Sequence, residues 1–248
     1  MNENRNNTPA QLSAGTTQAV PALELKNITK SYADGKEMRT VLNDVSLSVY
    51  PGELAAIVGP SGCGKSTLLN IAGMMQSPDS GSVILSGTDT TSGKKRMGKG
   101  SASSTKRAWA KLRRDHIGFI FQSHQLLPYL RGEDQLDVVK KISSSDKEKL
   151  LKELDLTEIR RQYPGAMSGG ERQRFAVARA FAANPDVILA DEPTAALDSV
   201  RGRKVVSMIA DEVHSRGKAA IMVTHDSRVL DLADTVYRME DGKLVKER

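Results

Sequence analysis

The chain is poor in cysteine and aromatic residues and lacks any long apolar run. Its single cysteine, Cys63, excludes an internal disulfide framework and predicts a reducing compartment. No stretch reaches the roughly 18 consecutive apolar residues of a membrane-spanning helix, so the sequence predicts no such helix. The N-terminal segment is polar and lacks the apolar core of a signal peptide. We expect residues 1–21 to form a disordered leader, because they bury too little apolar surface to offset the entropy of ordering.

The net charge of +6 is concentrated in one segment. Positions 93–114 contain no acidic residue but nine basic ones: Lys94, Lys95, Arg96, Lys99, Lys106, Arg107, Lys111, Arg113 and Arg114. Without them the chain has a net charge of −3. Two interpretations stay open, namely a solvated surface insertion or a contact with the inner membrane surface or a membrane partner. Single-stranded nucleic acid is disfavoured, because no series of aromatic residues accompanies the charges.

The 248 residues, 39% hydrophobic and 27% charged, are typical of one large globular domain or a domain with an insertion. Strand and helix patterns alternate along the chain, which predicts an α/β protein with a parallel sheet. Apolar patterns predict strands at 22–32, 40–50, 54–59, 117–121, 187–193 and 219–226, with hairpins at 78–87 and 235–247. Helices are predicted at 65–75, within 125–168 and at about 199–215, and a flexible Gly-, Ser- and Lys-rich loop at 92–105.

The strongest local motif is GPSGCGKST, which lies between a buried strand and a helix. Its glycines let backbone N–H groups close around phosphate oxygens, and the helix N-terminus adds partial positive charge. We expect Lys65 to reach the β- and γ-phosphates and Ser66 to offer a hydroxyl to Mg²⁺. The predicted phosphate loop consists of Gly59, Pro60, Ser61, Gly62, Cys63, Gly64, Lys65, Ser66 and Thr67.

A second motif, VILADEP, places two acids at the end of a buried strand. Asp191 can orient Mg²⁺ there, and Glu192 can polarise an attacking water. Paired acids after a strand are also often a loop start or a helix cap. The functional interpretation gains weight from the phosphate loop, because ligands gather at the carboxyl ends of parallel strands.

Residues 167–185, MSGGERQRFAVARAFAANP, begin with a Ser-Gly-Gly sequence typical of a helix start with exposed backbone donors or of an ordinary helix cap. This segment resembles the signature motif of the ABC ATPases. With the two motifs above, it makes the sequence resemble that family. The family pattern opens with Leu and usually has Gln fifth, where this chain has Met167 and Glu171. Both are variants found in similar sequences.

The resemblance assigns further residues. Tyr32 resembles the aromatic residue that stacks on adenine, although a strand tyrosine is often just packed. Gln122 resembles the glutamine that ligates Mg²⁺ and links the site to the helical lobe. Asp198 resembles part of the loop that crosses to the partner subunit, and His225 resembles the switch histidine that contacts the γ-phosphate. The remaining histidines, His116, His124 and His214, lie outside this pattern and are interpreted as surface or packing residues.

The resemblance therefore implies ATP and Mg²⁺ as cofactors. Catalysis would rest on Glu192, His225 and Lys65, and the metal on Ser66, Gln122 and Asp191. ATP would lie between the phosphate loop of one chain and Ser168, Gly169, Gly170 and Glu171 of a second copy, paired head to tail. The implied fold is a P-loop NTPase core, a RecA-like parallel sheet, with an antiparallel β subdomain and an inserted helical subdomain at about 123–180. The ATPase domain would span 22–248.

Function follows from the same resemblance. A single ATPase unit without a membrane span fits a transporter motor that drives a separate permease from the cytoplasmic side of the membrane, without contact to nucleic acid. A soluble ABC ATPase acting on ribosomes or DNA, and a regulatory module without turnover, are the alternatives from other classes. Residues 115–136 resemble the MacB-like and lipoprotein-release group, and residues 225–244 resemble the ATPase of bacterial haem exporters. Haem export is therefore predicted, with antimicrobial-peptide or lipoprotein export as alternatives.

Overall fold

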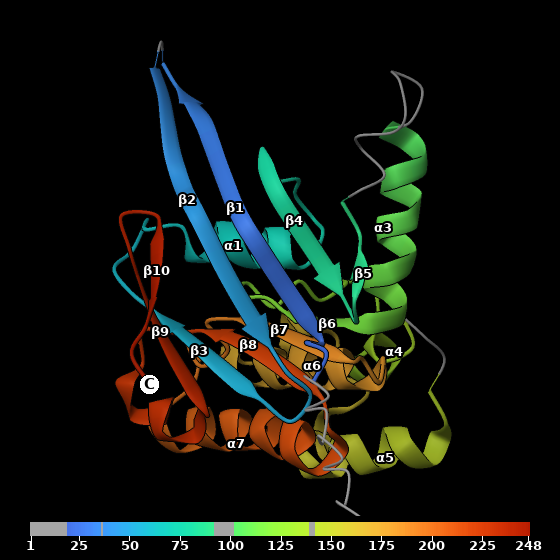
Figure 1. Cartoon of the computed structure of the whole chain (residues 1–248). Helices are drawn as coiled ribbons and strands as arrows, with labels where there is room; N and C mark the ends of the chain where they lie inside the picture. Colours follow the sequence, from blue (N-terminus) through green and yellow to red (C-terminus); the bar gives the residue numbers. More distant parts are fainter. Residues whose placement is uncertain (1–18, 36, 92–101, 139–141) are drawn as a thin grey trace, which may run out of the picture.

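The computed structural model describes residues 19–35, 37–91, 102–138 and 142–248, in which two β-sheets are covered by helices (Figure 1). The predicted disordered leader lies outside the described residues up to position 18. The same holds for part of the basic segment, including Lys94, Lys95, Arg96 and Lys99. In the described ranges no helix has the length and apolar character needed to cross a bilayer.

The larger sheet is mainly parallel and has the strand order β10-β9-β3-β8-β7-β6. Its strands are β3 (Leu54–Val58), β6 (Ile117–Ile120), β7 (Val187–Asp191), β8 (Ala219–Val223), β9 (Thr235–Glu240) and β10 (Lys243–Lys246). Strand β3 pairs in parallel with both β8 and β9, which places it inside the sheet. The predicted Asp241-Gly242 hairpin joins β9 to β10, and its φ angles of 45° and 73° are those of a type I′ turn.

The smaller sheet is antiparallel, with the order β2-β1-β4-β5. Its strands are β1 (Leu23–Asp34), β2 (Glu37–Val49), β4 (Ser80–Leu85) and β5 (Thr88–Asp89). Strands β1 and β2 form a long hairpin that rises well above the parallel sheet (Figure 1). They were expected as strands, and β2 begins three residues earlier than predicted.

Alternating residues of β3 divide the interior into two cores. Leu54 and Ala56 point to one side, where they join a cluster that includes Phe175 and Val206. Ala55 and Ile57 point to the other side and pack with a second cluster that includes residues of the antiparallel sheet. A strand buried on both faces needs a continuous apolar sequence, as Leu54–Val58 has.

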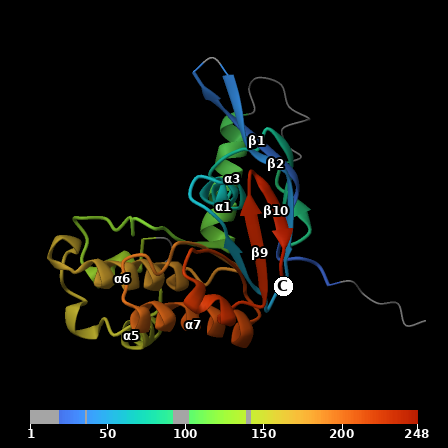
Figure 2. The ribbon, with the colours of Figure 1, turned by 90° about the vertical axis from the view of Figure 1, so that its left-hand side faces the viewer.

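Helices occupy both sides of the parallel sheet. Helix α1 (Lys65–Ala72) packs between it and the antiparallel sheet, whereas α6 (Gly169–Ala182) and α7 (Ser199–Arg216) cover the opposite face. Between β6 and α6 the chain forms α4 (Gly132–Gln135), α5 (Ser144–Glu153) and the 3₁₀ turns η1 (Thr157–Ile159) and η2 (Pro164–Ala166). Together with α6 they extend to one side, away from the long hairpin (Figure 2). The 3₁₀ helix η3 (Ser227–Leu232) follows β8.

One helix was not predicted. Helix α3 (Ala102–His116) stands beside β4 and β5 and includes residues 102–105, for which the expected flexible loop is wrong. Trp109 is its main anchor, because the side chain is buried and its indole N–H donates a 2.9 Å hydrogen bond to the carbonyl of Thr90. Few apolar residues accompany Trp109 in this basic segment, so its sequence shows only a weak helical periodicity.

Candidate active site

A cleft of about 450 Å³ opens at the carboxyl ends of β3, β7 and β8. Parallel strands end at the same edge of a sheet, so their following loops meet although they are far apart in the sequence. The cleft is lined by Arg39, Val41, Ser61, Gly62, Gly64, Lys65, Ser66, Thr67, Gln122, Asp191, Glu192, Val223 and His225. The structure thus brings together most of the predicted phosphate loop with the predicted acids, Gln122 and His225.

The phosphate loop leads from β3 into α1 and closes on itself. Gly59 has φ 152°, and a Cβ there would lie 2.1 Å from the carbonyl oxygen of Met239. Only glycine is compatible with so close a backbone approach. The ammonium of Lys65 donates 2.8 Å hydrogen bonds to the carbonyls of both Gly59 and Pro60. The cation therefore lies over the mouth of the loop, where it is suited to attract an anion.

Asp191, at the end of β7, faces the start of α1. Its Oδ1 accepts a 3.2 Å hydrogen bond from the hydroxyl of Ser66. Burial raises the pKa of the Asp191 carboxyl above its ordinary value, while the Ser66 hydrogen bond partly opposes that rise. Glu192 adds to the rise and Lys65 opposes it, so the two acids and the lysine act on one another in the same small space.

Glu192 follows in an unusual backbone conformation. Its φ of 50° is rare for a residue other than glycine, and its N–H bonds the carbonyl of Val223 on β8 at 3.0 Å. This geometry holds the carboxylate against His225, whose Nδ1 lies 2.8 Å from Glu192 Oε2. The Glu192 side chain is 12% exposed and that of His225 is 72% exposed. A strained residue held by two strands is a common feature of active sites.

Tyr32 and Arg39 stand opposite each other on the long hairpin. Tyr32 is not among the residues that line the cleft, and its hydroxyl accepts a 2.6 Å hydrogen bond from Gln76. Arg39 does line the cleft, together with Ser61 and Gly62 of the phosphate loop. No local sequence pattern points to Arg39, because its neighbours in space depend on the register between β1 and β2.

The predicted signature residues lie elsewhere. Ser168 caps α6, and the cap is reciprocal: the Ser168 Oγ accepts from the Glu171 N–H at 3.3 Å, and Glu171 Oε2 accepts from the Ser168 N–H at 2.7 Å. These hydrogen bonds lower the pKa of the Glu171 carboxyl. None of Ser168, Gly169, Gly170 and Glu171 lines the cleft that contains the phosphate loop.

The predicted crossing loop packs against this helix start. A Cβ at Gly170 would lie 3.1 Å from Leu197, and one at Gly169 would lie 3.8 Å from Ala196. Asp198 caps α7 by accepting from the Arg201 N–H at 2.9 Å, and its carboxylate also accepts from the Arg201 guanidinium at 2.7 Å. These bonds lower the pKa of the Asp198 carboxyl.

Of the histidines interpreted as ordinary, His124 has the most informative place. Its Nε2 lies 2.9 Å from the carbonyl oxygen of Gly169, so the segment after Gln122 contacts the signature residues directly. At the surface, His116 Nδ1 lies 2.7 Å from an Asp186 carboxylate oxygen and His214 Nε2 lies 3.0 Å from one of Asp234.

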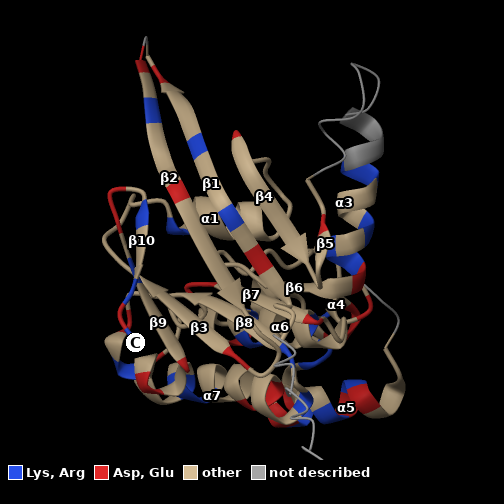
Figure 3. Cartoon of the chain, in the orientation of Figure 1, with Lys and Arg blue, Asp and Glu red and all other residues tan. Residues whose placement is uncertain are grey.

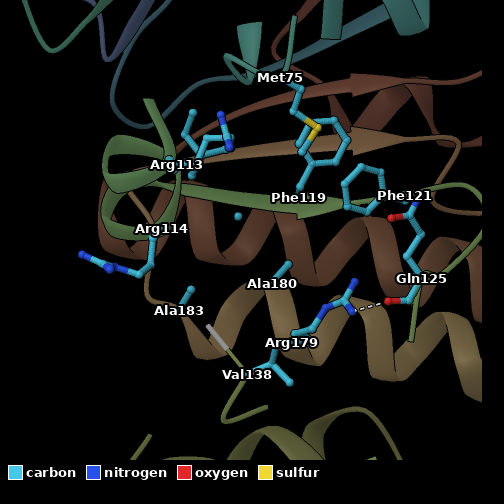
Figure 4. Close-up of a pocket in the computed structure, with 13 residues that line it drawn as sticks. Met75, Arg113, Arg114, Phe119, Phe121, Gln125, Val138, Arg179, Ala180 and Ala183 are labelled. Carbon is cyan, nitrogen blue, oxygen red and sulfur yellow. Dashed lines mark hydrogen bonds between the residues drawn. The ribbon is translucent and has the colours of Figure 1, made fainter. Parts of the chain in front are cut away.

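A second hollow of about 330 Å³, named the α3–α6 groove here, lies between α3, β6 and α6 (Figure 4). Phe119 and Phe121 stack in it at 4.2 Å between ring centroids, and Arg179 donates from below to the carbonyl of Gln125 at 2.6 Å. The groove is lined by Met75, Ala110, Arg113, Arg114, Ile117, Gly118, Phe119, Phe121, Gln125, Val138, Arg179, Ala180 and Ala183. Gln125 is three residues from Gln122, so the groove adjoins the cleft through one short segment.

Comparison with known proteins identifies the family. A family model described as "ABC transporter" matches residues 42–195, which include the phosphate loop, the signature residues and both acids. The chain belongs to the ABC transporter family. HrtA of Staphylococcus haemolyticus, named for hemin import, is 44% identical over 90% of this chain and 99% of its own length. MacB of Escherichia coli K12, named for macrolide export, is 40% identical over 91% of this chain, which spans 34% of the MacB length.

Solved structures agree with this assignment. The ABC cassette MJ0796, in a dimeric post-hydrolysis state bound to ADP and phosphate, is 34% identical, with a TM-score of 0.78 over 91% of this chain and 99% of its own. The predicted fold, a P-loop α/β core with an antiparallel sheet and added helices, is therefore confirmed. This ABC protein is an ATP-binding ATPase of the transporter class.

Proposed function

We propose that this chain is the ATP-hydrolysing motor of a haem exporter, acting in a head-to-tail pair with a separate permease. The pairing is supported by the separation of the signature residues from the cleft within one chain. The cleft holds Lys65, Asp191, Glu192 and His225, while Ser168–Glu171 lies outside it in the same chain. A second copy is the simplest source of the missing signature residues, and the dimeric state of MJ0796 supports that arrangement.

In the proposed reaction, Glu192 takes a proton from the attacking water as its oxygen bonds to the γ-phosphorus. The bond between that phosphorus and the β–γ bridging oxygen breaks, and ADP leaves with the electron pair. Lys65 neutralises the phosphate oxygens, and His225 holds the Glu192 carboxylate in place through their 2.8 Å contact. Tyr32 is proposed to stack on adenine, and Asp198 to approach the partner subunit.

The metal would be held by Ser66, Gln122 and Asp191. Hydroxyl, amide and carboxylate oxygens are the donors that Mg²⁺ prefers, and Ser66 and Asp191 already lie within hydrogen-bond distance of each other at 3.2 Å. When bound, Mg²⁺ supplies charge neutralisation at the transferred phosphoryl group. We also propose that 123–180 acts as a helical subdomain, which His124 couples to the signature residues through the Gly169 carbonyl.

The permease is proposed to bind at the α3–α6 groove, from the inner face of the membrane. Phe119 and Phe121 offer a stacked apolar floor, and Met75 and Val138 are partly exposed at 44% each. Arg113 and Arg114 add positive charge at one edge. An apolar helix with an acidic end is complementary to such a groove. Phe121→Asp would abolish capture of the permease, whereas Tyr50→Asp, an exposed aromatic outside the groove, would leave it intact.

Haem is the preferred substrate because HrtA, named for hemin, matches along nearly its whole length. The relatives disagree about direction. HrtA is named for import, whereas MacB and the syringafactin protein SyfD of Pseudomonas syringae are named for export. We propose export, since the sequence resembles exporters along its length, and macrolide- or lipopeptide-like substrates are the alternative that MacB and SyfD favour.

The experiment is to purify the chain with its permease from detergent-solubilised membranes and measure ATPase with and without haemin. A haemin-dependent rise that is absent from the Glu192→Gln complex would support haem transport. ATP-driven accumulation of haemin inside inside-out vesicles would establish export, and depletion would establish import. An ATPase rate that does not change with haemin would contradict haem as the substrate, but not the assignment of the chain as an ATPase.

A further inference from the structure

Helix α3 presents a basic face that no other part of the described chain neutralises. Arg107, Lys111 and Arg114 recur at i, i+4 and i+7, which places them on one side of the helix, and Lys106 flanks them. All four side chains are exposed. We call these residues the α3 basic face (Figure 3). Within the described residues Lys106, Arg107 and Lys111 have no ion pair, and Arg114 pairs only with its neighbour Asp115 at 3.0 Å.

The opposite side of α3 fixes the helix to the body of the protein. Trp109 is buried and bonds the Thr90 carbonyl, and Arg113 donates a 2.7 Å hydrogen bond to the carbonyl of Met74. Asp89, the acid of β5, accepts hydrogen bonds from the Thr91 N–H and hydroxyl. The basic face therefore points outward from a firmly held helix, and its charge is available to an external anion.

The place of the α3 basic face suggests which anion. Arg114 belongs to this face and also lines the α3–α6 groove, so the two surfaces are continuous. If the permease occupies that groove, as the proposed function has it, α3 lies beside the protein that spans the bilayer. Anionic headgroups of the inner leaflet attract clustered Lys and Arg side chains. Nucleic acid is disfavoured because the outward side carries no aromatic residue for base stacking.

We propose that the α3 basic face binds the anionic lipid surface next to the permease, as a second contact between this ATPase and the membrane. It would orient the subunit and raise its local concentration at the bilayer, without touching nucleotide. The proposal rests on the permease position given above only for its orientation. The charge and exposure of the face stand without it.

The test uses the full chain without permease, so that failure of the permease assignment does not affect it. Flotation would compare vesicles of phosphatidylcholine alone with vesicles that also contain phosphatidylglycerol, at low and high salt. We expect binding only to the anionic vesicles, weakened by salt. The triple variant Lys106→Gln, Arg107→Gln, Lys111→Gln should lose about 100-fold in vesicle affinity, since three of the four positive charges of the face are removed.

A matched control removes the same charge elsewhere. Lys152, Lys243 and Lys246 are exposed and have no ion pair in the described residues, so their triple change to Gln should retain vesicle binding. Equal loss in the control would show bulk charge alone and overturn the proposal, as would full binding by the α3 variant. Release by inorganic phosphate at constant ionic strength would indicate an anion site instead of a lipid surface. Tighter binding to duplex DNA or RNA than to vesicles would also overturn it.

Discussion

The cleft and the start of α6 are the two regions that the proposed head-to-tail pair would join around one nucleotide, and they are held in different ways. The cleft is assembled by loops after several strands, whose polar groups depend on one another: Ser66 bonds Asp191, and Glu192 meets His225. The start of α6 is complete within four residues, because Ser168 and Glu171 cap each other. We therefore expect the cleft to be sensitive to changes anywhere along the sheet edge, whereas the start of α6 should keep its geometry independently of the cleft.

The comparison is tested most strongly at Glu192. Glu192→Gln should lower steady-state ATP hydrolysis by about 10²–10⁴-fold, because the amide cannot accept the proton of the attacking water. ATP binding should persist, and size-exclusion chromatography should show an ATP-stabilised dimer. The exposed Glu148→Gln serves as the control and should hydrolyse ATP at the normal rate. Unchanged hydrolysis in the Glu192 variant would remove it from this role.

Lys65 is next in expected size. Lys65→Ala should weaken ATP binding by about 10–100-fold, the value of charged hydrogen bonds to phosphate oxygens. Isothermal titration of the isolated chain measures this loss without any requirement for dimerisation. Lys149→Ala, at an exposed ion pair on α5, is the matched change. If both variants bind ATP equally well, the phosphate-loop assignment fails.

The same contrast explains what could be predicted from sequence. The phosphate loop, the two acids and the Asp241-Gly242 hairpin are local patterns, in which neighbouring residues suffice to specify the geometry. Helix α3 was missed because its anchoring depends on Trp109 reaching Thr90, a contact that a Gly- and Lys-rich sequence does not reveal. Arg39 was missed because only the β1–β2 register brings it to the cleft. The contact of His124 with Gly169 joins residues 45 positions apart and leaves no local signal.

Variants of Ser168 distinguish its role as a helix cap from its proposed role in ATP hydrolysis. Ser168→Ala should destabilise the chain by about 1 kcal/mol, a fall in Tm of about 2–4 °C, because α6 loses its cap. Ser168→Asn should restore the Tm, since asparagine is an equally good cap. Both variants should bind ATP normally as isolated chains, and we expect both to hydrolyse it slowly, because the serine hydroxyl would serve the partner's nucleotide. Full hydrolysis by Ser168→Asn would reduce the residue to a helix cap.

Arg39 tests how far the cleft extends onto the long hairpin. Arg39→Gln should weaken binding of both ATP and ADP by about two- to fivefold, the effect of one exposed charge near phosphate. Arg39→Lys should keep most of the affinity, because the charge remains. The difference between Arg39→Gln and the native chain should shrink at high salt. A loss that is insensitive to salt would indicate stacking of the guanidinium on the base.

The smallest expected effect is that of Asp191→Asn, which should stabilise the chain, whereas the variants above lose activity, affinity or stability. Its pKa is raised by burial, so the stability that it contributes is present below the ordinary aspartate pKa and is lost as the pH rises through the higher folded-state pKa. At neutral pH, without nucleotide or Mg²⁺, Asp191→Asn should therefore raise the Tm by about 2 °C, a gain of less than about 1 kcal/mol because the carboxylate keeps partial solvent contact. The gain should vanish in acid, where the native carboxyl is protonated, and ATP with Mg²⁺ should stabilise the native chain more than the variant. An Asp191→Asn chain that is less stable at neutral pH would mean that the Ser66 hydrogen bond outweighs the cost of burying the charge, and that the cleft is held together by its acids even without a cation.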